Sequence, residues 1–162
     1  MKIGVIADTH IPERAKDVPQ EIITGLRGVD LIIHAGDITD FWVLDKLKEA
    51  CVNIKAVWGN MDPVEIRGKL PQKEIIFTAN YKIGVMHGWG HPDNLPELLG
   101  REFKNDSVQV IIFGHSHRPC NEWRDGVLYF NPGSPTDKVF SPYNSYGILE
   151  INDKIEARIV RL

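Results

Sequence analysis

The sequence predicts an α/β fold in which two packed, mixed β-sheets are flanked by helices. In the first 60 residues, short apolar runs alternate with amphipathic stretches, a pattern typical of parallel β-α-β units. In the last third, strand-like runs come in pairs separated by short turns, a pattern typical of antiparallel hairpins. A chain of 162 residues is also the size of one domain, so we expect residues 1–162 to form a single domain.

The expected elements of the first half alternate between strands and helices. They are a strand at 2–7, a helix at 18–27 with Pro19 in its first turn, a strand at 30–35, a helix at 41–50 capped by Asp40, a strand at 53–58 and a short helical or irregular connection at 63–70.

The second half is expected to contain more hairpins. The elements are strands at 74–78 and 82–86 joined by a turn at 79–81, a helix at 94–104 capped by Asn94, a strand at 108–113, a hairpin of 120–124 with 127–130 around Asp125-Gly126, and a hairpin of 145–151 with 154–160 around Asn152-Asp153. We find no internal repeat or linker in the sequence.

Composition narrows the possible functions. A formal net charge of -3 argues against a bulk electrostatic grip on nucleic acid. No apolar stretch approaches the roughly 20 residues that span a bilayer, and Met1-Lys2 leads directly into a strand, so we expect no membrane contact and no signal peptide. Two cysteines, Cys51 and Cys120, give no disulfide framework. We therefore expect a cytoplasmic protein.

Seven potential metal ligands directly follow the strand-like runs. They are Asp8, His10, Asp37, Asn60, His87, His115 and His117. Because the loops at the carboxyl ends of strands converge in α/β sheets, we expect these side chains to meet at one crevice. A mixed Asp, His and Asn set with one carboxylate able to bridge suits a pair of divalent ions such as Mn²⁺, Fe or Zn²⁺.

The motifs differ in how strongly each indicates a metal. Taken singly, Asp8-Thr9-His10 could be a helix cap with a surface histidine, and Gly36-Asp37 could be an ordinary turn, as well as metal ligands. Gly114-His115-Ser116-His117 is the strongest, because two histidines one residue apart beyond an apolar strand are seldom only structural. The spacing lets both rings face one cluster when the loop bends.

In this order, the motifs resemble those of the calcineurin-like binuclear metallophosphoesterase superfamily. The matching motifs are Asp8-x-His10, Gly36-Asp37, Gly59-Asn60, His87-Gly88 and Gly114-His115-x-His117, and Asn131-Pro132-Gly133-Ser134 resembles a turn of its compact bacterial and archaeal phosphodiesterases. That branch shares its fold with the scaffold subunit of retromer. The resemblance implies a metallophosphoesterase α/β sandwich.

The resemblance also implies which residues hold the metals. One ion would be held by Asp8, His10, Asp37 and His117, and the other by Asp37, Asn60, His87 and His115, with Asp37 bridging. It implies a hydrolase that cleaves phosphate diesters with a metal-bridging hydroxide, with Asp37 and Asn60 in catalysis and Asn60 also contacting substrate. Mn²⁺ is the favoured ion, and Ni²⁺, Fe²⁺ and Zn²⁺ also suit such ligands.

One position departs from the family pattern. Many members carry a histidine after the Gly-Asn pair, where it protonates the leaving group, whereas this chain has Met61 there. We therefore predict a preference for good leaving groups such as aryl or nucleotide esters. His91, in the Gly-rich loop that follows His87, is the candidate for a replacement proton donor and substrate contact.

Several other side chains have two readings. His34 is expected to be a hydrogen-bonded core histidine and Asp62 to anchor the Asn60 loop. Arg118 suits either a phosphate contact or an exposed salt bridge. Phe41, Trp42 and Trp89 suit either the core or stacking on a nucleotide base.

Two alternatives to a phosphodiesterase stay open. The same site would also serve a phosphomonoesterase, and the fold would serve an inactive, retromer-type scaffold that binds proteins. The expected partner is a small phosphodiester or nucleotide. The resemblance also allows a homo-oligomer, because small members of the group often form dimers.

Overall fold

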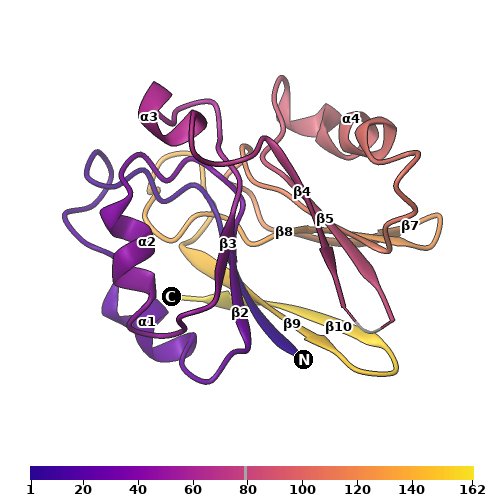
Figure 1. Cartoon of the computed structure of the whole chain (residues 1–162). Coiled ribbons are helices and arrows are strands. Elements are labelled where there is room, and N and C mark those ends of the chain that lie inside the picture. The colour runs from indigo at the N-terminus through magenta and orange to yellow at the C-terminus, as the bar shows by residue number, and fades with distance from the viewer. Residues whose placement is uncertain (79) are drawn as a thin grey trace.

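Two five-stranded β-sheets form the centre of the molecule in the computed structural model, which describes residues 1–78 and 80–162 (Figure 1). The first sheet has the order β10-β9-β1-β2-β3. Its strands are β1 (Lys2–Ile6), β2 (Leu31–His34), β3 (Ile54–Ala56), β9 (Ser145–Ile151) and β10 (Ile155–Arg161). The strands β1, β2 and β3 are parallel, and β9 and β10 add an antiparallel hairpin beside β1.

The second sheet has the order β4-β5-β6-β8-β7. Its strands are β4 (Lys73–Phe77), β5 (Lys82–Met86), β6 (Val110–Ile112), β7 (Cys120–Arg124) and β8 (Val127–Asn131). The central strands β5, β6 and β8 are parallel, and β4 and β7 are antiparallel edges. The prediction of two mixed sheets is confirmed.

The main apolar core lies between the two sheets. Alternate residues of each strand point to it, because successive side chains of a strand face opposite sides. Ile3 and Val5 of β1 and Ile83 and Val85 of β5 are buried there. This core holds the two sheets together, so that the carboxyl ends of their parallel strands lie next to one another.

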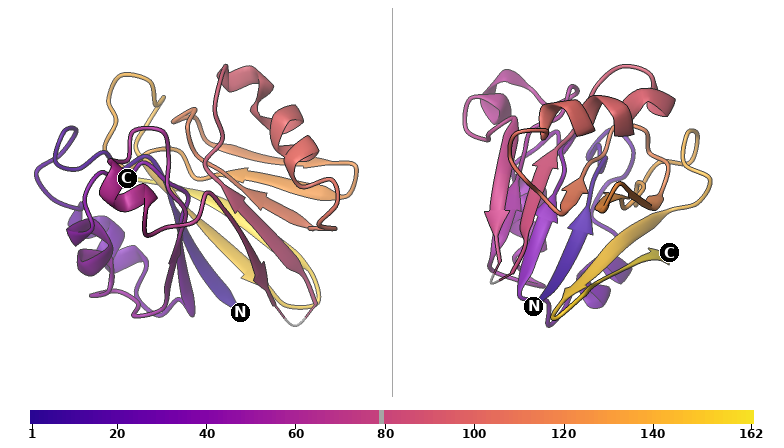
Figure 2. Two further views of the ribbon diagram at one scale, coloured as in Figure 1. Left: turned by 45° about the horizontal axis from the view of Figure 1, so that its top comes forward. Right: turned by 90° about the vertical axis from the view of Figure 1, so that its right-hand side faces the viewer.

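Helices cover the outer faces, as Figures 1 and 2 show. Over the first sheet lie α1 (Gln20–Gly25) and α2 (Trp42–Leu47), and over the second lie the short 3-10 helix η1 (Pro92–Asn94) and α4 (Leu95–Glu102); α3 (Val64–Arg67) follows β3. The face of β1 opposite the main core contacts α1 so closely that a Cβ on Gly4 would lie 2.5 Å from Leu26 Cδ2. Both faces of β1 are therefore covered, which explains its uninterrupted apolar sequence.

The expected helix boundaries need correction. The helix expected at 18–27 spans only Gln20–Gly25, and the one expected at 41–50 spans Trp42–Leu47. The N-cap position of α2 is Phe41 and not the predicted Asp40, although the Asp40 carboxylate accepts a hydrogen bond from the Trp42 backbone N–H at 3.1 Å. Asn94 precedes α4 but makes no side-chain capping bond, because the chain enters α4 from η1.

Two further sequence expectations concern the hairpin turn and membranes. Strands β4 and β5 pair antiparallel, as a hairpin requires, and Ala79 of the turn expected at 79–81 lies outside the described residues. No helix among the described residues combines the length and apolar character that crossing a bilayer requires.

Candidate metal centre

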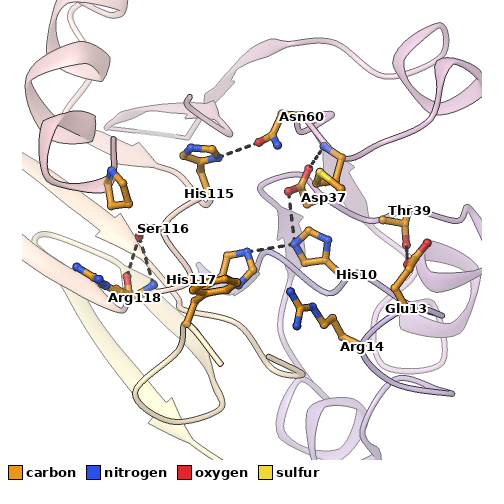
Figure 3. A pocket seen from close by; sticks show the side chains of 13 residues that line it. His10, Glu13, Arg14, Asp37, Thr39, Asn60, His115, Ser116, His117 and Arg118 are labelled. Carbon is orange, nitrogen blue, oxygen red and sulfur yellow. Dashed lines mark hydrogen bonds and ion pairs between the residues drawn. The ribbon is translucent and has the colours of Figure 1, made fainter. Parts of the chain in front are cut away.

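All seven predicted ligands lie together at the carboxyl ends of the strands of both sheets. Figure 3 shows five of them, His10, Asp37, Asn60, His115 and His117. Asp8 and His10 follow β1, Asp37 follows β2, Asn60 follows β3, His87 follows β5, and His115 and His117 follow β6. The first sheet thus contributes the oxygen ligands and His10, and the second sheet contributes the other histidines. Residues more than a hundred positions apart in sequence meet because the two sheets pack face to face and their strand ends lie side by side here.

The first half of the cluster consists of Asp8, His10 and His117. One potential ligand atom of each lies within 4.8 Å of the others. The Nε2 atoms of His10 and His117 are 3.2 Å apart, and His117 Nε2 is 3.6 Å from Asp8 Oδ1. His10 Nε2 also lies 3.4 Å from Asp37 Oδ2, which connects this half to the second.

The second half gathers around Asp37 and His87. His87 Nε2 is 3.2 Å from Asp37 Oδ2 and 3.2 Å from Asn60 Oδ1. His115 Nδ1 is 2.8 Å from the same Asn60 oxygen. Asp37 Oδ2 therefore faces a histidine of each half, which is the position that a bridging carboxylate needs.

The outward nitrogens of three imidazoles bond to the protein. His87 Nδ1 donates to the Ala35 carbonyl at 2.7 Å, His115 Nε2 donates to the Gly90 carbonyl at 2.9 Å, and His117 Nδ1 donates to the Asp137 carboxylate. A neutral imidazole carries one N–H, so the nitrogen that faces the cluster is left as a lone pair. A ring in this neutral form would present a lone pair toward the carboxylates, as a metal ligand does, and His87, whose pKa the carboxylates raise to about 9, would lose a proton on binding an ion.

Two carboxylates, those of Asp8 and Asp37, concentrate negative charge around His87. Burial disfavours the imidazolium form of His87, but the hydrogen bond to Asp37 and the charges of Asp8 and Asp37 outweigh this and raise its pKa to about 9. The two carboxylates therefore attract positive charge to the point where His87 Nε2 and Asp37 Oδ2 meet. A divalent cation would supply that charge.

Asp8 provides the test of whether a cation fits. Its Oδ2 is buried and has no hydrogen-bond partner in the part of the chain that the structure describes. Burial raises the pKa of this carboxyl to about 6, although the neighbouring His87 and His117 lower it. An unpartnered buried carboxylate oxygen beside imidazole lone pairs is a donor set that Mn²⁺, Fe²⁺ or Zn²⁺ accepts, so the residues fit the predicted metals.

The backbone of the cluster adopts the left-handed conformation at most ligands. The φ angles are 54° at Asp8, 43° at His10, 55° at Asp37, 67° at His115 and 57° at His117. Side-chain-bearing residues rarely adopt such angles, and they concentrate at functional sites where the surroundings enforce them. Five of the seven ligands share this conformation, and no residue pattern predicted it.

Asp62 joins the loops that carry Asp37 and Asn60. Its carboxylate accepts hydrogen bonds from the backbone N–H groups of Asp37, Ile38, Thr39 and Gly59 at 2.7 to 3.0 Å. Asp37 Oδ1 in turn accepts from the Met61 N–H at 2.7 Å. The prediction that Asp62 anchors the Asn60 loop is confirmed.

His34 lies beneath the cluster and is fully buried. Its Nδ1 accepts from the Gly36 N–H at 3.2 Å, and its Nε2 lies 3.1 Å from the Thr9 hydroxyl. Burial, together with the nearby charge of His87, lowers the pKa of His34 to about 3, so the ring is neutral. The prediction of a hydrogen-bonded core histidine is confirmed.

The segment after β8 supports the cluster from the other side. The Ser134 hydroxyl donates to the Asp8 carbonyl at 2.7 Å, and the Thr136 hydroxyl donates to the Thr9 carbonyl at 2.6 Å. Asp137, the partner of His117, comes from the same segment and has a fully buried side chain. Sequence reasoning missed Asp137, whose only signal is its place just beyond the Asn131–Ser134 turn.

A cavity of about 620 Å³ opens above the cluster, large enough for a nucleotide-sized ligand. Its lining comprises His10, Glu13, Arg14, Asp37, Thr39, Asn60, Met61, Pro92, His115, Ser116, His117, Arg118 and Phe140. Met61 and Phe140 are 61% and 60% exposed, so apolar groups form part of its wall. Phe140 was not singled out from the sequence.

Of the other residues considered for substrate contact, Arg118 lines the cavity, whereas His91, Phe41, Trp42 and Trp89 lie outside its lining. The His91 side chain is 68% exposed and accepts a long hydrogen bond of 3.4 Å from the Asp93 N–H. It is not among the residues that line the cavity, so its role as proton donor stays a prediction. Phe41 and Trp42 pack against the helical core of the first sheet, and Trp89 is 41% exposed outside the cavity lining. The cavity itself presents Phe140 as its aromatic surface.

Comparison with known proteins identifies the family. A family model described as the calcineurin-like phosphoesterase superfamily domain matches residues 1–154. A probable metallophosphoesterase of Methanocaldococcus jannaschii is 43% identical over 165 residues, which cover 99% of this chain and 81% of that protein.

The names of two other similar proteins point to different roles. Vacuolar protein sorting-associated protein 29 of Schizosaccharomyces pombe is 32% identical over 143 residues, covering 84% of this chain and 73% of that protein. A solved structure described as a novel archaeal phosphodiesterase has a TM-score of 0.80, is 26% identical and covers 100% of both chains. The match along almost the whole chain, together with the ligand cluster, leads to one conclusion: the chain belongs to the calcineurin-like phosphoesterase superfamily.

Proposed function

We propose that this protein is a cytoplasmic, metal-dependent phosphodiesterase whose two divalent ions, with Mn²⁺ favoured, bind at the cluster around Asp37. The observation that carries the proposal is Asp37 Oδ2, which lies 3.4 Å from His10 Nε2 and 3.2 Å from His87 Nε2. A carboxylate oxygen between two histidine groups is arranged to be shared by two ions. The likeness to an archaeal phosphodiesterase favours diesters over other phosphate esters.

The residues divide the work around this cluster. Two divalent ions would lower the pKa of a water molecule and offset the charge of phosphoryl oxygens. Asp8, His10 and His117 would hold one ion, His87, His115 and Asn60 the other, and Asp37 both. The neutral Asn60 amide would add no negative charge beside the substrate, and the cavity of about 620 Å³ leaves room for a phosphoryl group.

The test is hydrolysis of bis-p-nitrophenyl phosphate and p-nitrophenyl phosphate with Mn²⁺, beside measurement of bound metal per chain. Asp37→Asn removes the shared charge, and Asp153→Asn, in an exposed turn, is the charge-matched control. We expect diester turnover that Asp37→Asn reduces by at least about 10³-fold and that the control leaves unchanged.

Other outcomes would select an alternative. A preference for the monoester would support a phosphomonoesterase on the same site. Two bound ions per chain without turnover of either ester would favour a protein-binding scaffold, the reading suggested by the likeness to the vacuolar sorting protein.

The leaving group provides a second test. Met61 lines the cavity at the position where many relatives carry a proton-donating histidine, and a thioether has no proton to give. We therefore expect Met61→His to speed hydrolysis of diesters with alkyl leaving groups by about 10²-fold, the usual contribution of general acid catalysis, and to leave aryl diesters within about threefold. Equal effects on both ester classes, measured as kcat/KM, would show that another group already supplies the proton.

A further inference from the structure

Arg14 is a charged residue of the cavity that the metal cluster does not account for. It ends the turn that follows His10, with its backbone N–H donating to the His10 carbonyl at 2.7 Å. The side chain is 36% exposed and lines the cavity. Figure 3 shows its guanidinium beside His10 and close to His117. A positive charge therefore stands at the edge of the cluster, on the side of His10 and His117.

Asp137 forms an ion pair with this guanidinium. Its Oδ1 accepts from the Val139 N–H at 2.8 Å, and its Oδ2 accepts from His117 and from the Phe140 N–H at 3.2 Å. The Arg14 Nη1 lies 3.8 Å from Oδ1, which is beyond hydrogen-bond distance. The ion pair thus restrains the guanidinium without using its N–H donors. One buried carboxylate thus hydrogen-bonds a ring of the metal cluster and forms an ion pair with the cation beside it.

Phe140 adds a second restraint. The guanidinium carbon of Arg14 lies 5.8 Å from the centre of the Phe140 ring, within the range of a cation–π contact. The Phe140 ring also meets the His117 ring edge-on at 6.0 Å. Arg14 is therefore held between a carboxylate and an aromatic ring, both of which also contact His117.

We propose that Arg14 binds an anionic oxygen of the substrate's phosphoryl group on the His10–His117 side of the cluster. The inference deepens the proposed function and rests on it. A guanidinium suits this task because its planar N–H groups match phosphate oxygens and it stays charged at every relevant pH. Asp137 acts as a positioning residue, since it touches Arg14 and His117 and lies buried below the cavity.

The other arginine of the cavity is placed differently. The Arg118 side chain is 63% exposed, its Nη1 lies 3.8 Å from the exposed Asp93, and Figure 3 shows it directed away from the histidines. The geometry therefore assigns the phosphoryl contact to Arg14, and Arg118 serves as the rival to be tested.

The experiment compares wild type with Arg14→Met, Arg14→Lys and Arg118→Met, all loaded with Mn²⁺. Arg27→Met, in an exposed loop, removes the same charge away from the site. Calorimetric titration measures the binding of inorganic phosphate, and elemental analysis measures the metal content per chain. KM and kcat are measured with bis-p-nitrophenyl phosphate as substrate. We expect Arg14→Met to weaken phosphate binding and raise KM by about 10- to 100-fold, the worth of one charge-assisted hydrogen bond, with the metal content kept. Arg14→Lys recovers part of the loss.

Several results would overturn the inference. Arg14→Met could bind phosphate as wild type does, it could lose its metal, or Arg118→Met could carry the loss instead. Failure of wild type to bind phosphate would also overturn it. If metal-loaded wild type hydrolyses neither ester but binds phosphate in an Arg14-dependent way, the inference stands and the proposed activity fails, so the two are separable.

Discussion

The imidazole rings of His87, His115 and His117 are each fixed by the nitrogen that faces away from the carboxylates. The ligand residues themselves were predictable, because each follows an apolar strand and the strand ends converge. Their fixing partners were not. Two are backbone carbonyls, and the third, Asp137, lies 20 residues from His117 in a segment without metal-ligand spacing. Contacts of this kind depend on tertiary structure, which spacing along the chain does not encode.

Asp137→Ala tests the role of that partner. Removing the acceptor of the His117 N–H frees the ring to rotate and to change tautomer, and such losses weaken metal affinity by about 10- to 100-fold. We expect the weakening at one of two ions, because His87 and His115 keep their own partners. Titration with Mn²⁺ followed by calorimetry distinguishes the two affinities. Unchanged binding of both ions, with Asp153→Ala as control, would contradict this role for Asp137.

His34 predicts a pH dependence of stability in the metal-free protein. Its pKa is about 3 in the folded chain and 6.5 when unfolded, so between these values the unfolded state binds more protons. The stabilising contribution is complete above pH 6.5 and is lost as the pH falls toward 3. From pH 7 to pH 5 the loss is roughly 2 kcal/mol.

Urea unfolding of wild type and His34→Gln in EDTA at several pH values measures the contribution of His34 to the free energy of unfolding. His10, whose pKa is lowered to about 4 chiefly by burial, titrates in both proteins and cancels in the comparison. The variant should be less stable at pH 7 and should show a shallower decline toward pH 5. Parallel curves would mean that His34 is not the group that titrates.

The loops after the strands are the elements that build the site. The strands were well predicted, because their apolar runs are short and bounded by turn residues. The ends of the helices were not. After α2, the chain continues in turns with i to i+3 bonds, such as Ala50 N–H to the Leu47 carbonyl, so its helical hydrophobic pattern outlasts the α-helix. Loop conformation, including the left-handed ligands, was also beyond pattern reasoning.

Gly59→Ala tests how tightly the loops after β2 and β3 pack. A Cβ at Gly59 would lie 2.2 Å from Asp37 Oδ1 and 2.5 Å from the Asp37 backbone nitrogen, so the Asp37 loop must move. We expect a loss of about 1 to 3 kcal/mol in unfolding free energy and a reduced metal content. Gly68→Ala is the matched control, because its Cβ would lie 3.3 Å from its nearest neighbour at a φ of -73°. Equal stability of the two variants would refute close packing at Gly59.

At the scale of the whole molecule, the site lies between two sheets that are held together by their shared core. The sequence predicted two sheets and the convergence of the ligands, but it did not predict the strand orders. The C-terminal hairpin returns to pair β9 with β1, a contact between residues such as Lys2 and Glu150. Hydrophobic patterning specifies which face of each strand is buried, whereas it does not specify which strand lies beside which.

Metal binding should therefore stabilise the entire fold and not only its loops. An ion that contacts residues from both sheets binds only where they are packed together, so it favours the folded state by RT ln(1 + [M]/Kd), or about 2.7 kcal/mol per site at a hundredfold excess over Kd. In a domain of this size each kcal/mol raises Tm by about 2 to 4 °C.

We expect saturating Mn²⁺ to raise the Tm by roughly 5 to 10 °C per occupied site relative to EDTA, measured by calorimetry at pH 7.5. Mn²⁺ binds the ionised form of the Asp8 carboxyl, whose pKa in the metal-free fold is about 6. Protons therefore compete with the ion as the pH falls through 6, and the Mn²⁺ effect on Tm should shrink. Asp37→Asn, which removes the carboxylate shared by both halves, should lose most of the effect. A Tm that does not respond to Mn²⁺ in wild type would mean that the cluster does not bind the ion in the folded chain.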